Sequence, residues 1–192
     1  MKTRFLIITG MSGAGKTQVV RTLEDLKYFC IDNLPAALIP KFAELCRQTS
    51  ESNVALVVDV RGGQFFDKLL QVLDEIRASG QKYELLFLDA DDATLVRRYK
   101  ETRRRHPLGD SDTLLDNLAQ ERQLLEPLLE KASYIINTSE LNATELKNRI
   151  KELFSTDNER ERMGIVVRSF GFKHGLPLDS DLVLGVRFLP NP

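Results

Sequence analysis

The residues best suited to chemistry form one glycine-rich stretch near the N-terminus. The stretch matches G-x-x-x-x-G-K-[ST] and consists of Gly10, Met11, Ser12, Gly13, Ala14, Gly15, Lys16 and Thr17. An apolar run of strand length precedes it and apolar residues at helical spacing follow it, so the glycines are predicted to form a strand-to-helix turn. Such a turn surrounds phosphate groups with backbone N–H groups and a helix N-terminus. The sequence therefore predicts a site for a nucleoside triphosphate, with Lys16 on the outer phosphates and the Thr17 hydroxyl on Mg²⁺.

Acidic residues at the ends of predicted strands are the candidates for a metal ligand and for substrate orientation. Asp59 ends the apolar run 54–59 and would hold Mg²⁺ beside the phosphate loop, with helix capping as the alternative role. Asp32 follows the strand at 28–31, where it would either orient an acceptor hydroxyl or cap the next helix. Helix capping is sufficient to explain Asp89. We therefore place Asp59 with Lys16 in the catalytic set.

A basic segment follows the fourth predicted strand. Its arginines are Arg97, Arg98, Arg103, Arg104 and Arg105, and His106 and Pro107 come directly after them. As a lid, these guanidinium groups would neutralise transferring phosphates, with Arg103 and Arg104 as catalytic residues. Contact with a nucleic-acid backbone and a solvated helix face are the alternatives. The position of the segment between a strand and a long helix favours the lid.

The elements that must position these residues alternate between strand and helix. Strands are predicted at 5–9, 28–31, 54–59, 83–88 and 134–136, and helices at 16–26, 35–45, 65–76, 92–99, 114–129 and 143–153. The run 54–59 is apolar without alternation, which is typical of a strand buried on both faces of a parallel sheet. Five strand–helix repeats require right-handed crossovers. The predicted fold class is therefore α/β: a P-loop NTPase with a kinase-like five-stranded parallel sheet and helices on both faces.

Local signals sharpen the element boundaries. Pro35 suits the first turn of the helix predicted at 35–45. Asp91 or Asp92 can cap the helix predicted at 92–99. Pro127 is predicted to kink or split a long helix. Asn142 and Glu145 have the spacing of a capping box.

The chain is predicted to have three parts. Residues 1–154 form the P-loop nucleotide-binding domain, and the charged stretch 155–162 forms a linker. Residues 163–192 form the incomplete start of a C-terminal domain, with strands at 165–167 and 182–184 that cannot build a core by themselves.

Composition excludes several classes of protein. Of 192 residues, 42% are hydrophobic and 29% are charged, which is typical of a soluble globular protein. The net charge of −1 gives no overall attraction to nucleic acid or to an anionic membrane. Cys30 and Cys46 have no metal-ligand spacing and suit buried thiols in a reducing compartment. No apolar stretch approaches the ~18 residues of a membrane span. We therefore expect a cytoplasmic protein without a membrane partner.

Several stretches together resemble the RapZ/YvcJ family of bacterial nucleotide-binding proteins. These stretches are 10–17, 23–25 with 32–35, 59–61, 86–91, 97–99 with 102–104 and 106–108, 169–175 and the ending 187–192. The resemblance covers nearly the whole chain. It implies binding of ATP and GTP, with 10–17 as the phosphate loop and Asp59, Val60, Arg61 and Gly62 as a second nucleotide-binding segment.

The resemblance also implies a regulatory function. Family members show weak hydrolysis at best, and in enterobacteria the RapZ branch presents a small RNA to a ribonuclease and so controls amino-sugar synthesis. Members continue for roughly another hundred residues into a C-terminal domain associated with RNA and amino-sugar phosphates, and this chain is expected to end as that domain begins. We therefore expect weak Mg²⁺-dependent hydrolysis of ATP or GTP and weak RNA binding by these residues. A small-molecule kinase and a pure interaction module are the alternatives, and homo-oligomerisation is left open.

Overall fold

A computed structural model describes residues 4–48, 53–58, 63–80, 82–103, 106–109 and 113–155, together with 167, 169–171, 175 and 180–185. The chain divides into two compact units, Met1–Arg160 and Glu161–Pro192. The site and its surroundings lie in the first unit.

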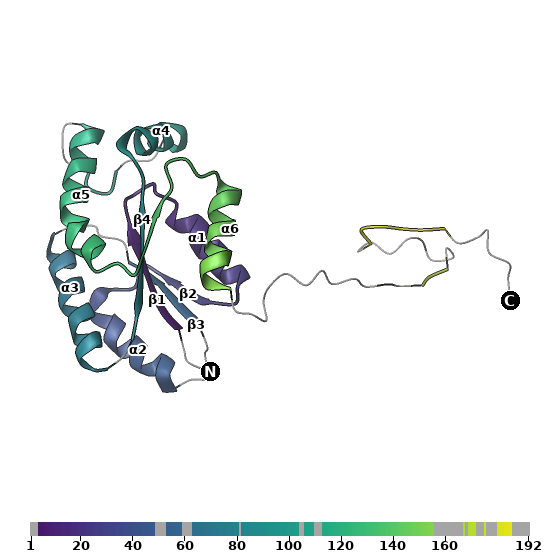
Figure 1. Cartoon of the computed structure of the whole chain (residues 1–192), viewed down its shortest axis with the longest axis horizontal. Helices are drawn as coiled ribbons and strands as arrows, with labels where there is room; N and C mark the ends of the chain where they lie inside the picture. The colour runs from purple at the N-terminus through teal and green to yellow at the C-terminus, as the bar shows by residue number, and fades with distance from the viewer. Residues whose placement is uncertain are drawn as a thin grey trace. The chain divides into compact units, whose positions relative to one another are not determined.

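The first unit is built on a five-stranded sheet (Figure 1). The strands are β1 (Arg4–Gly10), β2 (Phe29–Asp32), β3 (Asn53–Val57), β4 (Glu84–Asp89) and β5 (Tyr134–Asn137). All neighbouring strands pair in parallel, in the order β2-β3-β1-β4-β5. The predicted α/β fold class with its five-stranded parallel sheet is therefore confirmed.

Six α-helices and one 3₁₀ turn connect the described strands. They are α1 (Lys16–Asp25), η1 (Ala36–Leu38), α2 (Ile39–Gln48), α3 (Gly63–Ala78), α4 (Asp92–Thr102), α5 (Leu114–Glu130) and α6 (Ala143–Phe154). Helices α1 and α6 pack together on one side of the sheet, and α3 and α5 lie on the other (Figure 1). The two layers bury the sheet from both sides, which explains the unbroken apolarity of its central strands.

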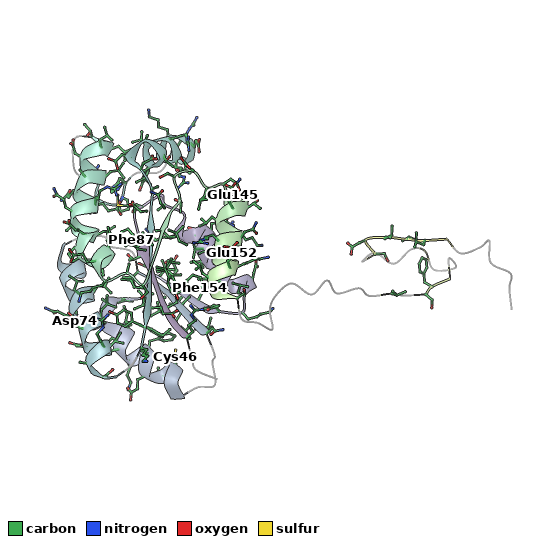
Figure 2. The ribbon with its side chains drawn as sticks, viewed as in Figure 1. Cys46, Asp74, Phe87, Glu145, Glu152 and Phe154 are labelled. Atoms are coloured by element: carbon green, nitrogen blue, oxygen red, sulfur yellow. The ribbon has the colours of Figure 1, made fainter. Side chains whose placement is uncertain are left out.

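Strand β1 lies at the centre of the core. Its residues Leu6, Ile7 and Ile8 are fully buried between β3 and β4. The amino end of the sheet is closed by Phe154, whose ring packs edge-on against Tyr134 with centroids 5.3 Å apart (Figure 2). The glycine-rich loop follows β1 at the opposite, carboxyl end of the sheet.

Helix termini follow the sequence signals closely. Asn142 accepts hydrogen bonds from the Thr144 and Glu145 amides while Glu145 accepts from the Asn142 amide, so the capping box is confirmed. Asp91, rather than Asp92, caps α4 through the Thr94 amide.

Two expectations about proline need correction. Pro35 caps the 3₁₀ turn η1, and α2 begins only after that turn. Pro127 was predicted to kink or split a helix; α5 continues through it to Glu130, so a split is wrong. Pro127 costs one backbone hydrogen bond near the helix end, whereas the flanking Leu125 and Leu128 are fully buried and hold that turn on the core.

The second unit is described at few positions. Leu182–Leu184 do not form the predicted strand, and Leu182 and Leu184 are 76% and 74% exposed. A strand requires a partner ladder and a covered face, and the described residues of this unit supply neither at that position. The other strand predicted there, 165–167, falls mostly outside the described residues. Within the described residues, no helix combines the length and apolarity that crossing a membrane requires.

Candidate nucleotide-binding site

The glycine-rich loop leaves the sheet at Gly10, the last residue of β1. Gly10 has φ of +133°, and a Cβ there would lie 2.1 Å from the carbonyl oxygen of Leu88 on the adjacent strand β4. The next residue, Met11, donates its backbone N–H to the same carbonyl at 2.9 Å. The loop can therefore start flat against β4 only if its first residue lacks a side chain.

The loop ends at the N-terminus of α1. Gly15 is the N-cap residue, with φ of +104°, and no side chain caps the helix there. Within the described part of the chain, the backbone N–H groups of Gly13, Gly15 and Thr17 have no protein acceptor. Open amides at a helix N-terminus attract anions, because the amide hydrogens and the helix dipole carry positive charge. The geometry is that of a phosphate site.

Lys16 lies over the loop that contains it. Its Nζ donates to the carbonyl oxygens of Gly10 at 2.6 Å and Met11 at 3.3 Å. The ammonium group is thus positioned at the loop, as its predicted role requires. Thr17 is exposed at the start of α1, and its hydroxyl is an oxygen donor of the kind that Mg²⁺ prefers.

The opposite side of the loop is bound by a buried carboxylate. Glu121 of α5 accepts the Ser12 hydroxyl at 2.6 Å and the Ser12 amide at 3.1 Å. The same carboxylate lies 3.1 Å from Nε2 of His106, and the two side chains are 3% and 1% exposed. Because Nδ1 of His106 accepts the Leu108 amide, Nε2 carries the hydrogen and donates it to Glu121.

A second clamp holds the middle of the loop. Arg98 of α4 donates to the carbonyl oxygen of Gly13 at 3.1 Å and to Thr138, the residue after β5, at 3.0 and 2.7 Å. The Thr138 hydroxyl in turn donates to the carbonyl oxygen of Ala14 at 3.0 Å. Burial, and secondarily the charge of Arg97, lower the pKa of Arg98 from its ordinary value. Arg98 therefore holds the loop, rather than belonging to a lid above it.

Arg122 holds the turn beside the loop, between β4 and α4. It donates to Asp89 at 2.9 and 3.2 Å, to Asp92 at 2.9 Å and to the Ala90 carbonyl at 3.0 Å. Burial tends to lower the pKa of Arg122, but its hydrogen bonds to Asp92 and Asp89 raise it above the ordinary value overall. Asp89 is therefore occupied by Arg122 and by the Ala90 amide, which agrees with a structural role.

The other predicted site residues fall at the same edge or outside the described residues. Asp59, Val60, Arg61, Gly62, Arg104 and Arg105 lie outside the described residues. Val58, which precedes Asp59, donates its amide to Ile8 of β1 at 2.9 Å, so the described end of β3 lies beside β1. Asp32 ends β2 opposite Val57 and is exposed. Arg103 is exposed at the C-terminal end of α4, with φ of +51°.

Sequence reasoning did not find Glu121, although a signal was present. Leu118, Leu125 and Leu128 are buried on one face of α5, and Glu121 lies on that face at helical spacing from Leu118 and Leu125. A carboxylate on a buried helix face needs hydrogen-bond donors.

Cys30 is no candidate for a reactive thiolate. Burial, and then the charge of Glu24, raise the pKa of its thiol to about 12.

Family models match both parts of the chain. The model described as the RapZ-like N-terminal domain matches residues 3–158, and the model described as the RapZ C-terminal domain matches residues 163–192. A nucleotide-binding protein of Clostridium botulinum is 54% identical over 192 residues, which cover 98% of this chain and 65% of that protein. The chain therefore spans about two thirds of the length of such relatives.

Solved structures with similar folds include kinases and a resistance protein. Shikimate kinase from Bacteroides thetaiotaomicron superposes with a TM-score of 0.51 at 20% identity, covering 78% of this chain and 97% of that one. The tunicamycin resistance protein of Deinococcus radiodurans gives a TM-score of 0.56 at 14% identity, covering 81% and 98%. At these identities the similarity establishes a P-loop kinase-like fold and nothing further.

Proposed function

Because the chain belongs to the RapZ-like family of nucleotide-binding proteins, we propose that the loop 10–17 binds ATP or GTP together with Mg²⁺. The observation that carries the proposal is the set of open amides of Gly13, Gly15 and Thr17 at the N-terminus of α1. Lys16 lies at the same loop and would supply a cation for the outer phosphates.

Mg²⁺ would bridge the outer phosphates and neutralise part of their charge. The Thr17 hydroxyl would hold the ion from the start of α1, and Asp59, after β3, is proposed as its second protein ligand. The segment Asp59, Val60, Arg61 and Gly62 is proposed as a further nucleotide contact. Its place in the sequence, directly after the strand beside β1, supports this assignment.

We propose that hydrolysis is slow and that the output is regulatory. Of the arginines in the basic segment, Arg98 is already bound to the loop, and the described arginines left exposed are Arg97 and Arg103. The charge that develops in the transition state of phosphoryl transfer is stabilised by several aligned cations. Arg103 and Arg104 therefore remain the proposed catalytic pair. In the whole protein, the family resemblance favours an adapter role in small-RNA processing in the cytoplasm.

A small-molecule kinase is the second candidate. Asp32 is exposed at the carboxyl edge of the sheet, where open α/β sheets bind ligands, and it would orient an acceptor hydroxyl there. Stimulation of nucleotide turnover by a metabolite, lost in Asp32→Asn, would support a kinase. Turnover that no acceptor stimulates would favour the regulatory protein.

A binding titration tests the main proposal. We expect Lys16→Ala to weaken ATP binding by at least about tenfold and ADP binding by less, because Lys16 is directed at the outer phosphates. Lys41→Ala is the matched control, since Lys41 is an exposed lysine of α2 paired with Glu44. Equal ATP affinity in wild type and Lys16→Ala would reject the assignment. Omission of Mg²⁺ in parallel titrations tests Thr17→Ala and Asp59→Asn as metal ligands.

RNA binding by this part of the protein is proposed to be weak. The net charge is −1, and RNA-binding surfaces need several cations along a backbone track. We propose 1–154 as the nucleotide-binding domain, 155–162 as a linker and 163–192 as the start of a C-terminal domain, to which the RNA function of the whole protein would then belong. Sub-micromolar, salt-resistant binding of structured RNA by residues 1–192 in a gel-shift titration would contradict it.

A further inference from the structure

Glu121 connects three segments that are distant in the sequence. Its carboxylate on α5 accepts hydrogen bonds from Ser12 of the phosphate loop and from His106 of the turn 106–109. Residue exposure is 2% for Glu121, 7% for His106 and 6% for Ser12, so water does not screen the contact. None of the proposed catalytic roles uses this carboxylate.

The turn 106–109 is organised by His106 itself. Its Nδ1 accepts the Leu108 amide at 3.2 Å, and its carbonyl oxygen accepts the Gly109 amide at 3.0 Å. Its ring packs on Tyr99 of α4, with centroids 5.4 Å apart. Among these contacts, the polar connection between the turn and the phosphate loop is the Glu121 carboxylate, which accepts from both His106 and Ser12.

We propose that Glu121 is a positioning residue that couples the phosphate loop to the turn 106–109, so that occupation of the loop by a triphosphate orders that turn. The inference rests on the proposed nucleotide site and adds a regulated element to it. If Ser12 moves, either the Glu121 carboxylate moves with it, or the buried amide and hydroxyl of Ser12 lose their acceptor. The second outcome is costly, so the loop and the turn move together.

The coupling extends the effect of the nucleotide toward Arg103, a proposed catalytic residue. Arg103 is the C-cap residue of α4 and lies three residues before His106, and α5 begins at Leu114 shortly after Gly109. A turn held by Glu121 thus anchors the chain shortly after Arg103. A ligand that lacks the outer phosphate would give less of this order.

Amide hydrogen exchange at single residues tests the proposal. In the wild type, ATP with Mg²⁺ should slow exchange at Gly15 and Thr17 and also, by about fivefold or more, at Gly109. In Glu121→Leu, the side chain offers no acceptor to the Nε2–H of His106 or to the donors of Ser12. The nucleotide effect at Gly109 should then disappear while the effect at Gly15 persists. Glu126→Leu, on the exposed side of α5, is the matched control.

A pair of variants at His106 keeps the test informative if Glu121→Leu does not fold. His106→Gln retains an N–H that can donate to Glu121, whereas His106→Leu has similar volume and no donor. Both lose the acceptor for the Leu108 amide, so that loss cancels between them. We expect nucleotide-dependent protection of Gly109 in His106→Gln and its loss in His106→Leu.

The outcomes separate the two proposals. Absence of protection at Gly15 and Thr17 in the wild type would reject the nucleotide site itself. Protection there without any effect at Gly109 would overturn the coupling. The same protection of Gly109 in wild type and Glu121→Leu, or in both His106 variants, would overturn it as well.

Discussion

Two neighbouring residues of α5, Glu121 and Arg122, hold the carboxyl edge of the sheet in different ways. Glu121 binds the back of the phosphate loop, and its side chain is 3% exposed. Arg122 binds the turn between β4 and α4 through Asp89 and Asp92, and its side chain is 41% exposed. One helix therefore fixes the loop with a buried network and the adjacent turn with solvated ion pairs.

The two sets of contacts differ in how strongly they fix the geometry of the segment that they hold. Solvent screens the Arg122 pairs, and exposed pairs contribute little to stability. The donors around Glu121 have no access to water, so each one depends on that carboxylate. The loop that is proposed to bind phosphate is thus the more rigidly held of the two regions.

Removal of Glu121 should give the largest effect. We expect Glu121→Ala to lower the free energy of unfolding by about 3 kcal/mol, because it leaves the Ser12 and His106 donors buried without an acceptor. Urea denaturation measures this difference. Glu126→Ala, on the exposed face of α5, should change stability by less than about 0.5 kcal/mol. Similar values for the two variants would remove the basis of the comparison.

Arg98 should give an intermediate effect. Arg98→Ala removes hydrogen bonds to the Gly13 carbonyl and to Thr138, in a partly buried site. We expect a loss of about 1–2 kcal/mol, together with weaker ATP binding, since the middle of the loop loses a fixed contact. A calorimetric titration beside the denaturation curve separates the two losses. An unchanged ATP affinity would show that the loop is positioned without this clamp.

Removal of Arg122 should have a smaller effect. Arg122→Ala breaks the contacts to Asp89 and Asp92, but the half-exposed position limits the loss to about 1 kcal/mol or less. The difference from wild type should also shrink as the salt concentration rises. A loss as large as that of Glu121→Ala, or one independent of salt, would contradict the contrast between the two residues.

The smallest effect concerns Asp91, in the turn that Arg122 holds. Hydrogen bonds from Thr94 lower the pKa of Asp91 below its ordinary value of about 3.9. The cap therefore stabilises α4 above that value and weakens as the pH falls through the lower, folded-state pKa. Amide protection at Thr94 should decrease below about pH 4 in the wild type. Asp91→Asn, which caps without titrating, should show no such decrease.

Local patterns made most of the fold predictable. The apolar runs gave the five strands, because a central parallel strand is buried on both faces. The capping box at Asn142 and the cap at Asp91 depend on residues three apart, which a sequence displays directly. The apolar run Leu182–Leu184 shows the limit of this reasoning, since a strand also needs a partner that the run cannot specify.

The residues proposed to contact the ligand were predictable from the sequence, whereas the residues that hold the loop in place were not. The glycines and Lys16 follow one another in a short motif, so their spacing revealed the phosphate loop. The groups that hold the loop come from distant elements: Glu121 lies 109 positions from Ser12, and Arg98 lies 85 positions from Gly13. Arg98 was predicted to face phosphate because the sequence shows its charge and not the carbonyl groups beside which α4 packs.

The contact between Gly10 and the Leu88 carbonyl has a consequence for mutational scans of the loop. A side chain at position 10 would overlap β4 whether or not a nucleotide is ever bound. Selection for folded protein alone should thus retain Gly10, while the same selection should accept many residues at the exposed position of Thr17. Selection for nucleotide-dependent function should restrict both. Tolerance to substitution at Gly10 would therefore measure what the fold requires, and tolerance at Thr17 would measure what the ligand requires.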